Sequence, residues 1–274
     1  MDGEVAFLWM ERTVRDMLKA SAPERANAEI WITEVGHRIE KKAGRTITEQ
    51  DAAKALAKIY TMSLAQKIAC TQWFEAQDPI GEDPGFGLLN REGKLRPSYT
   101  AVKTLTTHLG ATPRYLGWLT LGRNDRGYGF VFEGPSGPIL VAWMPAGMTD
   151  KSTVFASDVP ITDAVTSTTS LLKSGQHLSL TDSPALIAKL PPDLVNQAVS
   201  NTAKPFPWGG DFSAVKTVSC QPGLPDANPG ITQVGRAKSP IVTFPDGSTG
   251  ILVQGAISHP VSFTIHPSFA KFST

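Results

Sequence analysis

Apolar positions recur at two different spacings along the chain, and the change of spacing divides it near residue 110. In the first part, apolar residues return every three to four positions, which predicts amphipathic helices, and two short apolar runs between them predict buried strands. The elements alternate helix, strand, helix, strand, helix, so we expect a right-handed crossover between two parallel strands. The predicted elements are helices at residues 4–20, 48–69 and 96–109, strands at 29–34 and 70–75, and a polar loop at 37–46.

From residue 113 onward, short runs of aromatic and branched residues are separated by turn sequences. Asn124-Asp125-Arg126-Gly127 and Gly134-Pro135-Ser136-Gly137 are typical hairpin turns. This texture predicts an antiparallel β-sandwich over residues 113–192. Its strands are expected at residues 115–119, 129–132, 139–143, 153–155, 164–168, 177–180 and 185–188.

A second β-rich accessory segment is expected over residues 204–274, separated from the sandwich by Pro191 and Pro192. Because the sequence stops at residue 274 without a closing turn, we expect this segment to be truncated. A turn is expected at residues 245–248. The strands are expected at residues 215–220, 241–244, 250–253 and 261–265.

Composition and charge exclude several classes of protein. The hydrophobic fraction of 41% is that of a globular protein, and a net charge of +1 gives no bulk attraction for nucleic acid or an anionic membrane. No apolar run is long enough to span a membrane, and the start Met1-Asp2-Gly3-Glu4 does not resemble a signal peptide. Cys70 and Cys220 lie far apart and suggest neither a metal site nor a disulfide framework, so localisation stays undecided.

The strongest candidate for chemistry is Glu34, which ends the first predicted strand and is followed by Val35 and Gly36. The carboxyl ends of parallel strands are where α/β barrels place their catalytic groups. A surface glutamate at a strand end is the alternative. The histidines at positions 108, 177, 259 and 266 have unrelated spacings, and no serine lies in a nucleophile elbow, so neither metal nor cofactor nor esterase chemistry is indicated.

Four short motifs together resemble the last two βα units of clan A glycoside hydrolases, which are retaining (β/α)8-barrel enzymes, with families 5 and 39 the most similar in pattern. The resemblance implies that Glu34 is the nucleophile and that Trp73 is a platform for a sugar ring. It also implies a β-sandwich after the barrel, and hence an α+β multidomain fold with a partial barrel at residues 1–110. The motifs are residues 31–36 (WITEVG), 73–79 (WFEAQDP), 85–90 (GFGLLN) and 96–102 (RPSYTAV).

The sequence departs from this family in one important respect. The family's general acid/base is a glutamate that usually follows an asparagine on the fourth barrel strand, whereas the chain corresponds only to the part after the sixth strand and contains no Asn-Glu pair. A retaining glycosidase needs two carboxyl groups about 5 Å apart. Whether the chain is an enzyme is therefore open.

Further polar and aromatic residues are candidates for substrate contacts, each with a plainer alternative. Glu75 is either an acceptor for a sugar hydroxyl or a charge at the end of a loop, and Asp78 follows it in the same loop. His37 either hydrogen-bonds substrate or is a solvated loop histidine. Trp208, in Trp208-Gly209-Gly210-Asp211, either lines a carbohydrate groove or packs inside a sandwich.

Two functional hypotheses follow. The chain is a retaining glycoside hydrolase, or its C-terminal part, acting on a β-linked glycan or oligosaccharide; or it is a non-catalytic remnant that binds carbohydrate or serves a structural role. A two-stranded parallel sheet leaves unpaired edges and an apolar face, which predicts a homo-oligomer.

Overall fold

The computed structural model describes residues 3–42, 45–80 and 85–208, together with three short strands near the C-terminus. The chain divides into two compact units, with the boundary between Trp208 and Gly209.

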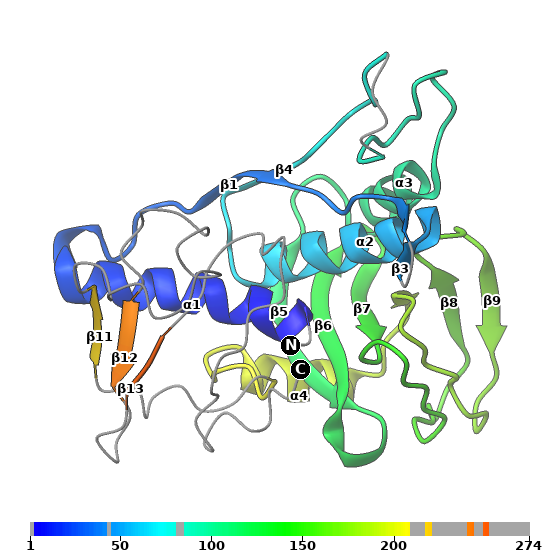
Figure 1. The fold of residues 1–274 in the computed structure, drawn as a ribbon. Helices are drawn as coiled ribbons and strands as arrows, with labels where there is room; N and C mark the ends of the chain where they lie inside the picture. The colour runs from blue at the N-terminus through cyan, green and yellow to red at the C-terminus, as the bar shows by residue number, and fades with distance from the viewer. Residues whose placement is uncertain are drawn as a thin grey trace. The chain divides into compact units, whose positions relative to one another are not determined.

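The first half of the larger unit contains the predicted parallel strand pair (Figure 1). Strands β1 (Trp31–Val35) and β4 (Cys70–Trp73) pair in parallel and form a two-stranded sheet, which confirms the predicted orientation. The crossover between them contains α2. The three predicted helices are also present, as α1 (Gly3–Ser21), α2 (Glu49–Ala65) and α3 (Pro97–Leu109), with a short 3-10 helix η1 (Pro23–Arg25) after the first.

Helix α2 begins with a reciprocal cap. The Thr48 hydroxyl accepts a hydrogen bond from the Asp51 backbone N–H (3.2 Å), and the Asp51 carboxylate accepts one from the Thr48 backbone N–H (2.9 Å). Such a capping box satisfies two backbone donors that the first helical turn leaves free. Burial acts to raise the pKa of Asp51, but the hydrogen bonds from Thr48 outweigh it and hold that pKa below its usual value.

One predicted loop is in part a hairpin. Residues 37–46 were expected to be irregular, but β2 (Glu40–Lys42) and β3 (Arg45–Ile47) pair antiparallel, with Glu40 opposite Ile47. The prediction was wrong because this stretch is almost entirely polar and so lacks the alternating pattern that marks a half-buried strand. Backbone pairing alone forms the ladder.

The second half of the unit forms one six-stranded antiparallel sheet in the order β5-β6-β7-β10-β8-β9. The first three predicted strands are confirmed, and β10 matches the last. A second sheet facing this one is not found among the described residues, so the predicted sandwich is not confirmed. The strands are β5 (Arg114–Leu121), β6 (Gly127–Gly134), β7 (Gly137–Trp143), β8 (Val159–Asp163), β9 (Thr169–Leu172) and β10 (Ala185–Ile187), with 3-10 helix η2 (Arg123–Asp125) between the first two.

Three predicted strands of this region were wrong. Residues 164–168 form the turn between β8 and β9, where the Asp163 carboxylate accepts hydrogen bonds from the backbone N–H groups of Val165 (2.9 Å) and Thr166 (2.8 Å). Such side-chain bonds compete with a sheet ladder and favour a turn over the strand that the branched residues predict. Residues 153–155 and 177–180 contribute only isolated bridges, at Val154 with His177 and at Asp150 with Leu180.

Helix α4 (Pro192–Asn201) covers one face of this sheet and was not predicted. Gly117 makes the close approach possible: its φ is +149°, and a Cβ there would overlap the carbonyl group of Ala198. The Asn201 amide also donates to the Trp118 carbonyl (3.1 Å). The side chains under the helix form an apolar cluster of buried residues that includes Leu119, Val131, Leu140, Phe155, Ile187 and Ala198.

Aromatic side chains on alternate positions of β6 occupy the other face, and Trp208 packs on them. The Trp208 ring centroid lies 4.8 Å from that of Tyr128 and 5.2 Å from that of Phe130, and its indole N–H donates to the Gly127 carbonyl (3.2 Å). The ring is half-buried. Of the two expectations for Trp208, packing against a sheet is the one seen.

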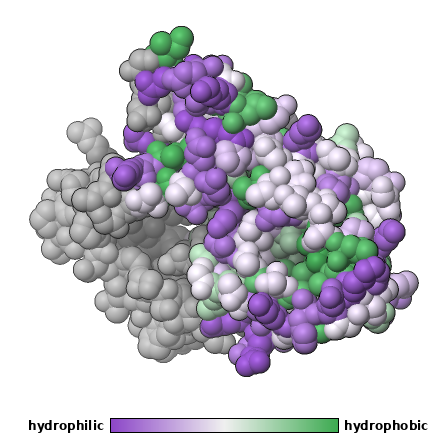
Figure 2. All heavy atoms as spheres, turned by 90° about the vertical axis from the view of Figure 1, so that its right-hand side faces the viewer, coloured by the Kyte–Doolittle hydropathy of each residue, from purple (hydrophilic) through white to green (hydrophobic). Residues whose placement is uncertain are grey.

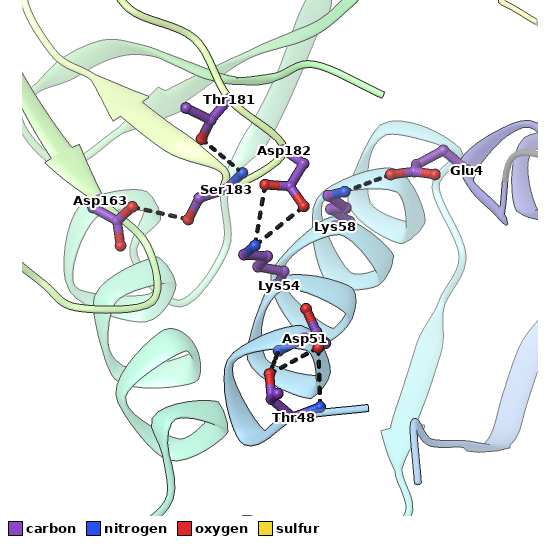
Figure 3. Close-up of polar contacts among 9 residues, drawn as sticks. All are labelled: Glu4, Thr48, Asp51, Lys54, Lys58, Asp163, Thr181, Asp182 and Ser183. Carbon is purple, nitrogen blue, oxygen red and sulfur yellow. Dashed lines mark hydrogen bonds and ion pairs between the residues drawn. The ribbon is translucent and has the colours of Figure 1, made fainter. Parts of the chain in front are cut away.

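Two ion pairs connect α2 to other parts of the unit, one to α1 and one to a residue next to the sheet (Figure 3). Lys58 of α2 contacts Glu4 of α1 at 2.6 Å, with both residues buried. Lys54, one turn earlier, contacts both carboxylate oxygens of Asp182 at 3.1 Å, next to the sheet. The helical half and the six-stranded sheet are therefore joined by a direct side-chain contact as well as by packing of α2 and α3 on β6.

Figure 2 views the side on which β8 and β9 lie and shows hydrophilic residues interspersed with several hydrophobic areas, the broadest of them at the lower right. The edge strand β9 has mainly exposed residues, Thr169, Ser170 and Leu171.

Among the helices of the described residues, none is both long enough and apolar enough to cross a membrane.

The smaller unit contains a three-stranded antiparallel sheet of β11 (Thr217–Cys220), β12 (Pro240–Thr243) and β13 (Thr249–Ile251). These strands overlap three of the four predicted there. The fourth, at residues 261–265, and the turn at 245–248 lie outside the described residues, as do residues 209–211.

Candidate functional site

The parallel pairing of β1 and β4 brings Glu34 and Trp73 to the same end of the small sheet. Val35 is opposite Trp73 in the register, and the Phe74 backbone N–H donates to the Val35 carbonyl at 2.8 Å. Glu34 directly precedes Val35, in a register shift between Ile32 and Val35. Such irregularities re-aim side chains and are frequent beside active sites.

Glu34 itself is exposed. Within the described ranges, its carboxylate forms no ion pair or hydrogen bond with another side chain. An exposed carboxylate of this kind is accessible to a ligand, and retaining hydrolysis requires in addition a second carboxyl group about 5 Å away.

The Trp73 side chain is half-buried, and its indole N–H donates to the Phe86 carbonyl at 3.0 Å. Burial raises the pKa of Tyr60 on α2, and the Trp73 backbone acts to lower that pKa. A half-exposed indole fixed in this way has the properties of a stacking surface for a sugar ring.

Asp78 is buried, with 3% of its surface exposed, and its carboxylate is turned into the loop. One oxygen accepts hydrogen bonds from the backbone N–H groups of Phe86 (3.0 Å) and Gly87 (2.6 Å), and the other is 2.6 Å from the Arg96 guanidinium. Gly87 is required at this place because a Cβ would lie 2.6 Å from the Asp78 backbone nitrogen.

Arg96 connects this loop to two helices. Besides Asp78, its guanidinium contacts the carboxylate of Glu49 (3.1 Å) and the carbonyl of Gly87 (3.2 Å). Glu49 is the first residue of α2, and Arg96 itself caps the start of α3. The loop after β4 is thus anchored at both helix starts.

Glu75 and His37 follow the two strands at the same end of the sheet, as the sequence predicted for loop residues. Both side chains are half-buried and both take part in interactions with other residues. One carboxylate oxygen of Glu75 is inaccessible to solvent. Their proposed contacts with substrate remain predictions.

The described part of the chain contains no group of three or more side chains suited to hold a metal ion. Cys70, at the start of β4, is a free cysteine. The site therefore consists of a carboxylate, an indole and the two flanking polar side chains.

No family model matches this sequence, and no curated protein matches it. Among the solved structures that are similar to part of the chain are three glycoside hydrolases. A family 39 glycoside hydrolase from the gut symbiont Bacteroides cellulosilyticus WH2 has a TM-score of 0.46 at 18% identity, over 66% of this chain. A family 30 endoxylanase from Clostridium papyrosolvens C71 has a TM-score of 0.41 at 11% identity, over 60% of this chain.

The third is a family 30 subfamily 8 xylanase from Clostridium acetobutylicum, with a TM-score of 0.40 at 15% identity, over 60% of this chain. The chain spans 37%, 43% and 43% of the lengths of these three structures. The partial barrel expected from the sequence stays a prediction.

The sequence motifs proposed Glu34 and Trp73 as site residues but not the contacts around Trp73. Arg96 and Phe86 appeared only as parts of motifs, and neither was given a contact. The signal for Arg96 was present in its position directly before Pro97, at a helix start, but its partners are 18 and 47 residues away, beyond the reach of local patterns.

Proposed function

We propose that this chain contributes the nucleophile and a sugar platform to the active site of a retaining glycoside hydrolase. Glu34 attacks the anomeric carbon, and the Trp73 indole stacks on the sugar ring. The observation that carries the proposal is the register of the parallel pair, which aligns Val35 with Trp73 and so puts the carboxylate and the indole at one end of the sheet. The carboxyl end of parallel strands is where such folds place catalysis.

In this proposal, Glu75 and His37 contact sugar hydroxyls from the loops that follow the two strands. The substrate is a β-linked glycan or oligosaccharide, as the sequence motifs imply. The chain contains no Asn-Glu pair of the kind that supplies the general acid in these enzymes, so we propose that another residue or a partner provides it. General acid assistance contributes about 10²–10⁴-fold, so turnover without it depends strongly on the leaving group.

A second function is favoured by the exposure of the Glu34 side chain. In that alternative, the same surface binds carbohydrate without cleaving it. The indole then supplies most of the affinity, and the glutamate only accepts a hydrogen bond from the ligand.

A panel of aryl β-glycosides tests these functions. A dinitrophenolate leaving group departs without protonation, so formation of the glycosyl-enzyme from dinitrophenyl glycosides does not need the general acid, whereas its later hydrolysis still needs a water molecule. The wild type is compared with Glu34→Gln and with Glu24→Gln, which changes an exposed glutamate elsewhere. We expect turnover that is lost in Glu34→Gln and kept in Glu24→Gln.

Background rates in all three proteins would contradict the hydrolase proposal. The binding alternative would then be supported by oligosaccharide affinity that Trp73→Ala removes and that Glu34→Gln leaves within a few-fold. Absence of binding as well would contradict both functions.

The predicted homo-oligomer also stays a proposal. Trp31, on β1, is 58% exposed, and Met17 on α1 is 52% exposed, so apolar surface is available on this half of the unit. Sedimentation at micromolar concentration should show a species larger than the monomer. A strict monomer over the whole concentration range would contradict self-association.

A further inference from the structure

We propose that Asp78 and Arg96 form a positioning pair that fixes the orientation of the Trp73 indole through the Phe86 carbonyl group. The importance of this pair for sugar recognition rests on the platform role proposed for Trp73. The claim that the pair orients the indole depends only on the contacts among these residues.

The first step is the hydrogen bond that holds the indole. An indole N–H is a donor only and has a single hydrogen to give, and that of Trp73 is given to Phe86 at 3.0 Å. The place of this carbonyl group therefore selects the rotation of the half-buried ring.

The second step is what holds Phe86. One carboxylate oxygen of Asp78 accepts hydrogen bonds from the backbone N–H groups of both Phe86 and Gly87 and so fixes the positions of two successive peptide units. Hydrogen bonds to a charged acceptor are roughly twice as strong as neutral ones, and the near-complete burial of Asp78 strengthens them further.

The third step is charge compensation. A buried carboxylate needs a partner, and Arg96 supplies it at 2.6 Å while also contacting Glu49 and the Gly87 carbonyl. Three acceptors in different directions suit the planar, multi-donor guanidinium group and not the single ammonium group of lysine. The guanidinium group thereby connects the loop to the first residue of α2 and to the start of α3.

The Phe86 side chain extends the same connection to the nucleophile strand. Its ring lies 5.4 Å from that of Phe74 in an edge-to-face arrangement, and a Cβ on Gly36 would lie 3.0 Å from it. Gly36 is two residues after Glu34. One loop residue thus packs against the ends of both strands that hold the proposed site.

This assignment gives Asp78 a role different from the substrate contact expected from the sequence. Both of its oxygens are used within the protein, and 3% of the residue is exposed. Asp78 acts on the site through Phe86, so it is a positioning residue and not a catalytic one.

The test is fluorine NMR of the chain labelled with 5-fluorotryptophan, which gives one resonance for each of the six tryptophans. Trp73→Phe assigns the Trp73 resonance by its loss. Asp78→Asn and Arg96→Lys are expected to shift or broaden that resonance and leave Trp143 unchanged. Asp182→Asn is the matched control, because it breaks an ion pair of the same unit that does not reach the loop.

An unchanged Trp73 resonance in either folded variant would overturn the proposal. A measurement on the unmutated protein keeps it falsifiable if the variants do not fold: the Trp73 indole N–H should exchange with solvent more slowly than that of Trp31, which is bonded only to the exposed Glu29. Equal exchange rates would also overturn it.

Sugar binding is measured separately on the same variants. We expect Arg96→Lys to weaken oligosaccharide affinity roughly tenfold, as a misplaced binding group does, and Asp182→Asn to leave it unchanged. If the wild type binds no sugar, the proposed function fails, but the NMR result still supports or overturns the positioning pair by itself.

Discussion

Two sheets in one unit differ sharply in how they bury their side chains. Trp143 in the six-stranded sheet is 0% exposed, whereas Trp31 in the β1–β4 pair is 58% exposed. The large sheet is covered by α4 on one face and by aromatic and helical packing on the other, while the small pair leaves its Glu34 end open. The difference shows that the large sheet has a buried aromatic core, whereas the small pair has an exposed indole and an exposed carboxylate on β1.

The largest effect should distinguish these two tryptophans. Trp143→Ala removes a fully buried ring that stacks near Tyr128 and Phe130, and is expected to lower the free energy of unfolding by about 3–5 kcal/mol. Trp31→Ala is expected to change it by about 0.5 kcal/mol or less. Urea unfolding followed by circular dichroism measures both, and similar losses would contradict the contrast.

The next effect concerns the ion pair that joins α1 to α2. Lys58→Met removes one partner of a buried ion pair, which should cost about 3 kcal/mol, because breaking such a pair from one side is expensive. The double variant Lys58→Met with Glu4→Leu should regain most of the loss. A single variant as stable as the wild type would show that α1 does not depend on this contact.

A smaller effect is expected where α2 meets the sheet. Lys54 and Asp182 retain 25% and 32% side-chain exposure, so water screens their attraction. Asp182→Asn should therefore lower the free energy of unfolding by about 0.5–1 kcal/mol. A loss as large as that of Lys58→Met would mean that the two halves depend on this pair far more than its exposure implies.

The smallest effect depends on pH. Thr48→Ala removes the cap of α2 and should cost about 1 kcal/mol at pH 7. Because the hydrogen bonds of Thr48 hold the pKa of Asp51 below its usual value of about 4, the stabilisation is present above that value and is lost as the pH falls through the lower, folded-state pKa. In thermal unfolding, the difference between variant and wild type should shrink as the pH falls below the usual pKa of aspartate, and a constant difference would contradict the cap.

Local signals explain which elements could be predicted. The apolar spacing of α2, the capping residues Thr48 and Asp51, and the proline that opens α3 all act within a few residues, and these elements are present as expected. Helix α4 had a similar signal in Pro192 and Asp193, a proline and an acid in the first turn, that was not used. Apolar spacing and helix-start residues can both be recognised from the sequence without knowledge of tertiary structure.

The misses have non-local or competing causes. The turn at residues 164–168 contains branched residues, but the Asp163 side chain takes their backbone donors and the ladder forms on either side of them. At the site, Glu34 and Trp73 were identified from motifs, whereas the contacts of Arg96 with Asp78 and Glu49 depend on the folded arrangement of three elements. The pattern of apolar and polar residues alone predicts neither the turn at residues 164–168 nor the contacts of Arg96.

The most direct test of the central proposal, that Glu34 is a nucleophile, is to trap its covalent intermediate. The wild type is incubated with dinitrophenyl 2-deoxy-2-fluoro-β-glycosides, whose fluorine slows hydrolysis of a glycosyl-enzyme, and the intact protein and its peptides are analysed by mass spectrometry. We predict an added mass of one fluorosugar on the peptide that contains Glu34, present also in Glu24→Gln and absent in Glu34→Gln. No adduct, or an adduct on Glu75 instead, would contradict the account.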